Sequence, residues 1–171
     1  MDFIVDDVLD VSLQRFWNVL FFDREYDRAL YDFLRLDPER LVFEWHGEGD
    51  DLHVRRRLRI MPRRDIPAFI KTVLRGMLAY EECITLNARE RRMDVKVVLP
   101  VIGERVDVSG HYEFEGLPGD KLRWRYQGRC VARIPLLGHK IDEFMVGEFR
   151  KAMAEVATFT KHWLTAHPTR P

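Results

Sequence analysis

The 171 residues suffice for one domain that buries about two-thirds of the surface of its unfolded chain, and the hydrophobic share of 46% is globular. The 28 basic and 28 acidic side chains cancel, which argues against a nucleic-acid partner. No uncharged run exceeds eight residues, far below the ~20 of a membrane span, and the acidic start at 1–7 is unlike a secretory signal. We therefore expect a single cytoplasmic domain over residues 1–171.

The first part of the chain predicts one strand and two short helices. Residues Phe3–Leu9 alternate weakly between apolar and polar side chains, as a short strand does. Ser12 can cap a helix because its hydroxyl accepts a hydrogen bond from the free amides of the first turn. Apolar residues then repeat at helical spacing over 13–21 and again over about 24–34. Neither helix is long, so each needs a sheet to cover its apolar side.

Between Arg40 and Ile134 the hydrophobic period changes to two, which predicts an antiparallel meander. Turn-forming Gly, Pro and Asp residues separate most of its runs. The expected strands are Leu41–Gly47, Leu52–Ile60, Tyr80–Arg89, Met93–Leu99, Arg105–Glu115 and Lys121–Arg133. The last run is the clearest, because its apolar side chains face one way and its arginines the other.

Two further segments have helical spacing. The segment 63–77 interrupts the meander with apolar residues among basic ones. Three interpretations of this segment stay open: a lid over a cavity mouth, an element in transient contact with an anionic membrane, or a plain connecting helix. A long helix begins after Pro135, with an apolar stripe from Ile141 to Trp163. Such a stripe, ~30 Å long, crosses the whole face of a six- or seven-stranded sheet.

The order of elements predicts an α+β fold. A curved antiparallel sheet of about seven strands wraps around the long C-terminal helix, and two short helices follow the first strand. A sheet that hugs the helix gives a filled core, whereas a sheet bowed away from it leaves a cavity. The pattern of residues allows both.

The residues of several familiar reactions are missing. Neither Ser12 nor Ser109 lies in a Gly-x-Ser-x-Gly elbow, and the chain has no glycine-rich phosphate loop. The six histidines show no His-x-x-x-His spacing. Cys83 and Cys130 cannot make a four-thiolate zinc site, and their strands are not expected to be neighbours, so we predict two free thiols. We predict no catalytic residue of these kinds, no metal and no cofactor.

Two charged residues interrupt apolar alternations on neighbouring strands. Arg56 shares a face with Leu52, Val54, Leu58 and Ile60. In the next strand, Glu82 shares a face with Tyr80, Ile84 and Leu86. If both faces point at the helix, the two charges must pair with each other, with water or with a ligand, because an unpaired buried charge is costly. The alternative is a register shift that turns Arg56 outward, beside its exposed arginine neighbours.

The order of elements and one segment resemble a known superfamily. The segment 128–144, Gly-Arg-Cys-Val-Ala-Arg-Ile-Pro-Leu-Leu-Gly-His-Lys-Ile-Asp-Glu-Phe, looks like the last strand and the turn into the helix of an uncharacterised bacterial group. That group lies within the START-like superfamily, also called SRPBCC, helix-grip or Bet v 1-like. The ranges 3–22, 63–76 and 160–164 also look like this group, and Gly138-His139 stands where it has Gly-Gly. The resemblance implies the helix-grip fold and a cavity for a hydrophobic ligand between sheet and helix.

With this cavity, polar and aromatic side chains of the sheet and thioethers of the helix form the predicted ligand-binding lining. Its residues are Arg56, Tyr80, Glu82, Tyr112, Trp124, Tyr126, Met145, Phe149 and Met153. The first functional hypothesis is binding or carriage of a small hydrophobic ligand that is lipid-, sterol- or polyketide-like. The second is a cyclase- or dehydratase-like enzyme in which Glu82 or a tyrosine moves a proton. The third is an interaction module without a ligand.

Overall fold

The computed structural model describes residues 1–168, and its elements follow the predicted order. The strands are β1 (Asp2–Leu9), β2 (Leu36–His46), β3 (His53–Pro62), β4 (Tyr80–Asn87), β5 (Arg92–Val98), β6 (Val106–Leu117) and β7 (Lys121–Ala132). The helices are α1 (Leu13–Trp17), the π-helical turn η1 (Asn18–Phe22), α2 (Arg24–Phe33), the 3-10 turn η2 (Gly49–Asp51), α3 (Ala68–Val73) and α4 (Gly138–Ala166).

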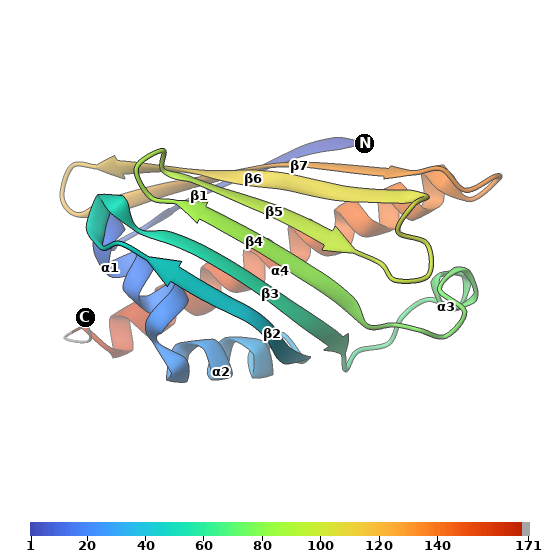
Figure 1. Cartoon of the computed structure of the whole chain (residues 1–171), viewed down its shortest axis with the longest axis horizontal. Coiled ribbons are helices and arrows are strands. Elements are labelled where there is room, and N and C mark those ends of the chain that lie inside the picture. Colours follow the sequence, from blue (N-terminus) through green and yellow to red (C-terminus); the bar gives the residue numbers. More distant parts are fainter. Residues whose placement is uncertain (169–171) are drawn as a thin grey trace.

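Within these residues the strands form one antiparallel sheet in the order β1-β7-β6-β5-β4-β3-β2. The sheet curves around α4, which crosses its inner face, while α1 and α2 lie at one end and α3 at the other (Figure 1). In β7, Leu122, Trp124 and Tyr126 are buried on this inner face, and Arg123 and Arg125 are exposed. The α+β fold with a sheet gripping a long C-terminal helix is therefore confirmed.

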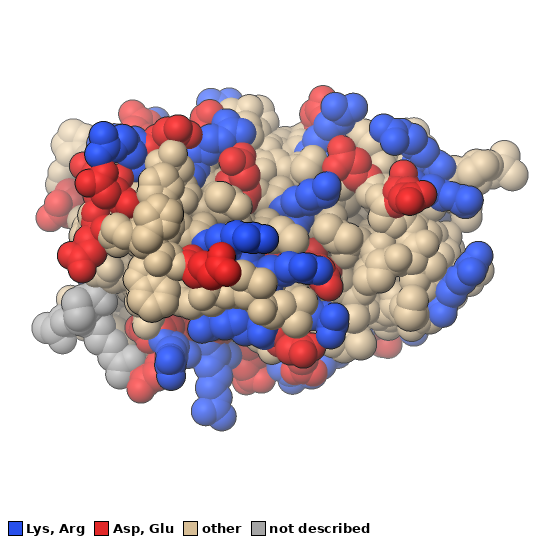
Figure 2. Space-filling model, viewed as in Figure 1, with Lys and Arg blue, Asp and Glu red and all other residues tan. Residues whose placement is uncertain are grey.

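The outer face of the sheet is solvated and carries both signs of charge. Figure 2 shows basic and acidic side chains mixed over this face. On β3, Arg55, Arg57 and Arg59 point outward and form ion pairs across the sheet, and Arg56 between them points inward. Their carboxylate partners are Glu44, Glu81 and Glu39. Alternation thus divides the run of arginines between two faces of the sheet.

Three predicted elements differ from the structure by more than one or two residues at an end. The strand β2 begins at Leu36 rather than Leu41 and contains Pro38, which is tolerated because β2 is an edge strand. The first helix changes to π-helical spacing after Trp17, where the Asp23 amide donates to the Asn18 carbonyl at 3.0 Å. The insert over 63–77 is helical only in α3.

Gly110 and Gly128 face each other across β6 and β7 and make room for two aromatic rings. A Cβ at Gly128 would lie 2.5 Å from ring atoms of both Phe3 and Tyr126, closer than packing permits. A Cβ at Gly110 would lie 2.5 Å from the Tyr126 hydroxyl oxygen. The Tyr126 ring lies over this gap and stacks on Phe149 of α4, with centroids 5.3 Å apart and an interplanar angle of 13°. This end of the sheet–helix interface is therefore filled.

Asp142, near the start of α4, contacts the end of β7. Its Oδ1 accepts a hydrogen bond from the Ala132 amide at 2.7 Å and from the Cys130 thiol at 3.6 Å. Burial, and then the Asp142 charge, raise the pKa of Cys130 to about 12, so this thiol stays protonated. Cys83 on β4 and Cys130 on β7 are both free, and two strands separate them.

Candidate ligand-binding site

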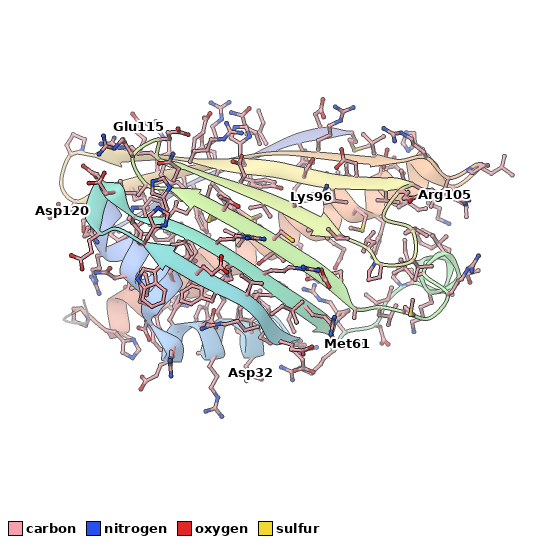
Figure 3. The ribbon with its side chains drawn as sticks, viewed as in Figure 1. Asp32, Met61, Lys96, Arg105, Glu115 and Asp120 are labelled. Carbon is pink, nitrogen blue, oxygen red and sulfur yellow. The ribbon has the colours of Figure 1, made fainter. Side chains whose placement is uncertain are left out.

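A cavity of about 260 Å³ lies between the inner face of the sheet and α4. The wall formed by the sheet includes Ile84 and Val95, and the wall formed by the helix includes Met145 and Met153. The segment 62–78 and the helix α2 close it at the ends, and Asp32 and Met61 in Figure 3 mark where α2 meets the end of β3. Apolar side chains make most of the lining. At this place the interface between sheet and helix leaves a cavity instead of a filled core.

Arg56 is the charged residue buried most deeply in this wall. Only 6% of it is exposed, and it lies on the inner face of β3 between Val54 and Leu58. Its Nη2 atom is 3.6 Å from Oε1 of Glu82 on β4, and its guanidinium lies 5.7 Å from the centroid of the Phe21 ring. The inward orientation of both charges, predicted from the alternation, is confirmed.

Asp27 of α2 is a third member of this charged group that the sequence analysis missed. Its Oδ1 is 3.6 Å from Arg56 Nη1, and its Oδ2 is 3.6 Å from Arg40 Nη2 at the sheet edge. The helical spacing could have indicated it, because Asp27 lies three residues before Leu30 and four before Tyr31. Residues at this spacing share one side of a helix, and Leu30 and Tyr31 are both buried. The guanidinium of Arg56 is thus held between carboxylates from two different elements.

Glu82 is a carboxylate inside the protein with part of its surface toward the cavity. Its side chain is 24% exposed, and since Glu82 lines the cavity this exposed part faces it. Burial raises the pKa of Glu82, and the Arg56 charge opposes this only in part. For Arg56, burial lowers the pKa, but tyrosine and carboxylate neighbours outweigh it, so its pKa is raised and it stays charged. The guanidinium of Arg56 is therefore charged, whereas the carboxyl group of Glu82 releases its proton at a higher pH than an exposed glutamate does.

Three tyrosines add neutral polar groups to the lining. Burial raises the pKa of Tyr31, Tyr80 and Tyr112, so all three hydroxyls stay protonated. The Tyr112 hydroxyl donates to Sδ of Met153 at 2.7 Å and joins the sheet wall to the helix wall. The lining also includes Trp124, whose buried Nε1 has no hydrogen-bond partner within residues 1–168.

The structure places every predicted lining residue at the cavity except Tyr126. Tyr126 lies behind the lining, where it stacks on Phe149 and covers Gly110. The structure therefore places Tyr126 outside the lining, because its ring fills space that would otherwise extend the cavity. Alternation alone does not separate a ring that fills a core from one that lines a cavity, since both face inward.

The segment 62–78 closes one end of the cavity. Ile70 and Leu74 are buried and pack with Ile141 at the start of α4. At the same end, Arg64 Nη1 lies 3.2 Å from Oε2 of Glu148, and both residues line the cavity. The apolar side of the insert thus faces the protein itself, as expected both of a lid and of a plain connecting helix, and membrane contact through 63–77 stays a prediction.

No group of three His, Cys, Asp or Glu residues in the described part of the chain is placed to hold a metal ion. Among the helices of residues 1–168, none has the length and apolar character needed to cross a membrane.

A curved seven-stranded antiparallel sheet around a long C-terminal helix is the helix-grip fold. The chain belongs to the family described as "Protein of unknown function (DUF2505)", whose model matches residues 6–164. A comparison with curated proteins finds no match.

Solved structures share the fold at low sequence identity. TTHA0849 from Thermus thermophilus is 11% identical with a TM-score of 0.59, over 97% of this chain and 98% of that one. Norcoclaurine synthase from Thalictrum flavum, in complex with dopamine and hydroxybenzaldehyde, is 14% identical with a TM-score of 0.56, over 99% and 89%. The Zhui aromatase/cyclase from Streptomyces sp. R1128 is 12% identical with a TM-score of 0.56, over 98% and 94%.

Proposed function

We propose that this protein is a single domain that binds a compact hydrophobic ligand in the cavity between its sheet and α4. The observation that carries the proposal is the cavity itself, with apolar walls and one buried charged pair, Arg56 and Glu82. Ligand sites are typically concave and mostly apolar, with a few polar groups that fix orientation. The fold is also that of norcoclaurine synthase, which was solved with dopamine and hydroxybenzaldehyde bound.

The size of the cavity limits the ligand. Its volume of about 260 Å³ lies just below the ~300 Å³ at which ordinary ligand pockets begin. Among the candidates, this favours one or two fused rings over a sterol or a long-chain lipid.

A second candidate is an enzyme of the cyclase or dehydratase kind, favoured by one observation. Glu82 is a carboxylate with a raised pKa whose side chain faces the cavity, which is the property that a proton-transfer group needs. The Zhui aromatase/cyclase has the same fold. Chemical conversion of a bound compound, followed by mass spectrometry, separates this candidate from a carrier.

A substitution that fills the cavity tests the proposal. Ala152 of α4 lines the cavity, whereas Ala154 on the same helix is exposed. With 2-naphthol as the probe, we expect one molecule to bind per chain in a fluorescence titration. Ala152→Phe is expected to weaken binding at least ten-fold because its ring occupies the cavity, and the matched Ala154→Phe is expected to bind as the unchanged chain does. Equal affinities of both variants, or no binding to the unchanged chain, would contradict a cavity site and favour an interaction module without a ligand.

A further inference from the structure

The carboxylate of Glu82 has hydrogen-bonding capacity left over for a ligand. An ionised carboxylate offers about four acceptor positions. The Arg56 atom nearest to Glu82 is 3.6 Å from its Oε1, which is longer than a good hydrogen bond. Because part of the Glu82 side chain faces the cavity, a molecule there can reach it.

Both arginines of the cavity wall already have carboxylate partners. Arg56 lies between Glu82 and Asp27, each at 3.6 Å. Arg64 pairs with Glu148 at 3.2 Å. The wall therefore offers no cation free to bind an added anion, since each of its two arginines already faces a carboxylate of the wall.

The other polar groups near Glu82 do not supply a free cation to the cavity either. Arg40 lies beyond Asp27 at the sheet edge, with 40% of its side chain exposed, and does not line the cavity. Tyr31 and Tyr80 line the cavity as neutral hydroxyls. A ligand carboxylate would lie near Glu82 with no cation of its own, and like charges in a poorly solvated place repel strongly.

We propose that the ligand presents a neutral or cationic hydrogen-bond donor, such as an aromatic alcohol or amine, to Glu82, and that the cavity excludes carboxylates. This inference rests on the proposed function, and it adds the chemical class of the ligand and its orientation. The donor end lies against Glu82, and the apolar body lies between Val95 and Met145. The selectivity comes from Glu82, because this carboxylate attracts a donor and repels an anion.

Three probes with the same two-ring body test the inference: naphthalene, 2-naphthol and 2-naphthoate. At neutral pH we expect 2-naphthol to bind at least ten-fold tighter than 2-naphthoate. Glu82→Gln removes the negative charge and keeps the shape, so it is expected to strengthen 2-naphthoate binding and to reduce the ratio to about three-fold or less. The matched control is Glu81→Gln on the same strand, which faces outward and pairs with Arg57 and Arg59. This control is expected to keep the ratio of the unchanged chain.

The outcomes separate the two proposals. Binding of 2-naphthoate as tight as that of 2-naphthol to the unchanged chain would overturn the inference and leave the cavity site standing. An unaltered ratio in Glu82→Gln, with circular dichroism showing a folded variant, would also overturn it. Failure of all three probes to bind would remove the proposed function together with the inference. The ratio in the unchanged chain decides the matter even if Glu82→Gln does not fold.

Discussion

Replacing Arg56 with Met is expected to lower the free energy of unfolding by about 3–5 kcal/mol, the usual cost of removing one partner of a buried ion pair. The substitution leaves Glu82 inside the protein without its guanidinium, and Asp27 loses one of its two arginines. Glu82→Gln is expected to cost less, because Arg56 keeps Asp27 as a partner and the removed carboxylate is already disfavoured by burial. Urea unfolding of each variant measures both values.

The double variant isolates the interaction between the two charges. Arg56→Met with Glu82→Gln is expected to recover much of the loss, since no lone charge remains in the wall. Arg57→Met is the matched control, because Arg57 is the next residue of β3, points outward and is half exposed. Its loss is expected to cost no more than about 1 kcal/mol. Additive effects of Arg56 and Glu82, each below about 0.5 kcal/mol, would mean that the pair contributes nothing.

The cost of Arg56→Met is also expected to depend on pH. Without the opposing guanidinium, burial raises the pKa of Glu82 further above its unfolded value of about 4.3. Below that value the folded and unfolded chains are both protonated at Glu82, so no penalty arises there. As the pH rises from the unfolded pKa toward the higher folded pKa, the unfolded chain releases a proton that the folded chain retains, and stability falls. The deficit of the variant should therefore be larger at pH 8 than at pH 5, and a deficit independent of pH would exclude Glu82 as its source.

Phe149→Ala is expected to enlarge the cavity at a reduced cost in stability. A fully packed Phe or Trp loses about 3–5 kcal/mol on truncation to Ala. Phe149 packs on Phe3 and Tyr126 on one side and lines the cavity on the other, so we expect a loss of about 2–3 kcal/mol. Trp17, which is 1% exposed, is the control that should show the full loss.

The same variant is expected to change which molecules bind. A three-ring probe, 2-hydroxyanthracene, should bind to Phe149→Ala at least ten-fold tighter than to the unchanged chain, because the removed ring adds room beside the cavity. Fluorescence titration measures the change, and urea unfolding measures the stability. A loss as large as that of Trp17→Ala with no gain for the larger probe would indicate a filled core at this position.

The sheet and the long helix could be predicted because their patterns are periodic. In β7 the alternation of buried and exposed residues has the period of a strand, and the order of elements left few ways to arrange them. The inward pair of Arg56 and Glu82 followed from the same alternation, because a charge among apolar neighbours on one face is informative. The start of β2 was missed because Pro38 normally ends a strand, and only the edge position explains it.

The charged group and the limits of the cavity depend on contacts between distant elements. Asp27 reaches Arg56 only because α2 packs against the end of the sheet, and no local pattern determines that distance. Tyr126 and Trp124 alternate identically along β7, yet one fills the core and the other lines the cavity. The difference comes from Gly110 and Gly128, which have no side chains and so leave room for the Tyr126 ring above them. Side-chain packing of this kind is decided in three dimensions.

A compact ligand between the sheet and α4 must touch both walls of the cavity, and intermolecular nuclear Overhauser effects to bound 2-naphthol measure these contacts. We expect contacts from the naphthol ring protons to the methyl groups of Ile84 and Val95 on the sheet and of Met145 on the helix at the same time. We expect none to Ile4 or Val8, which are exposed on β1. Contacts confined to such exposed methyl groups, with none to the two cavity walls, would contradict a ligand site in the cavity.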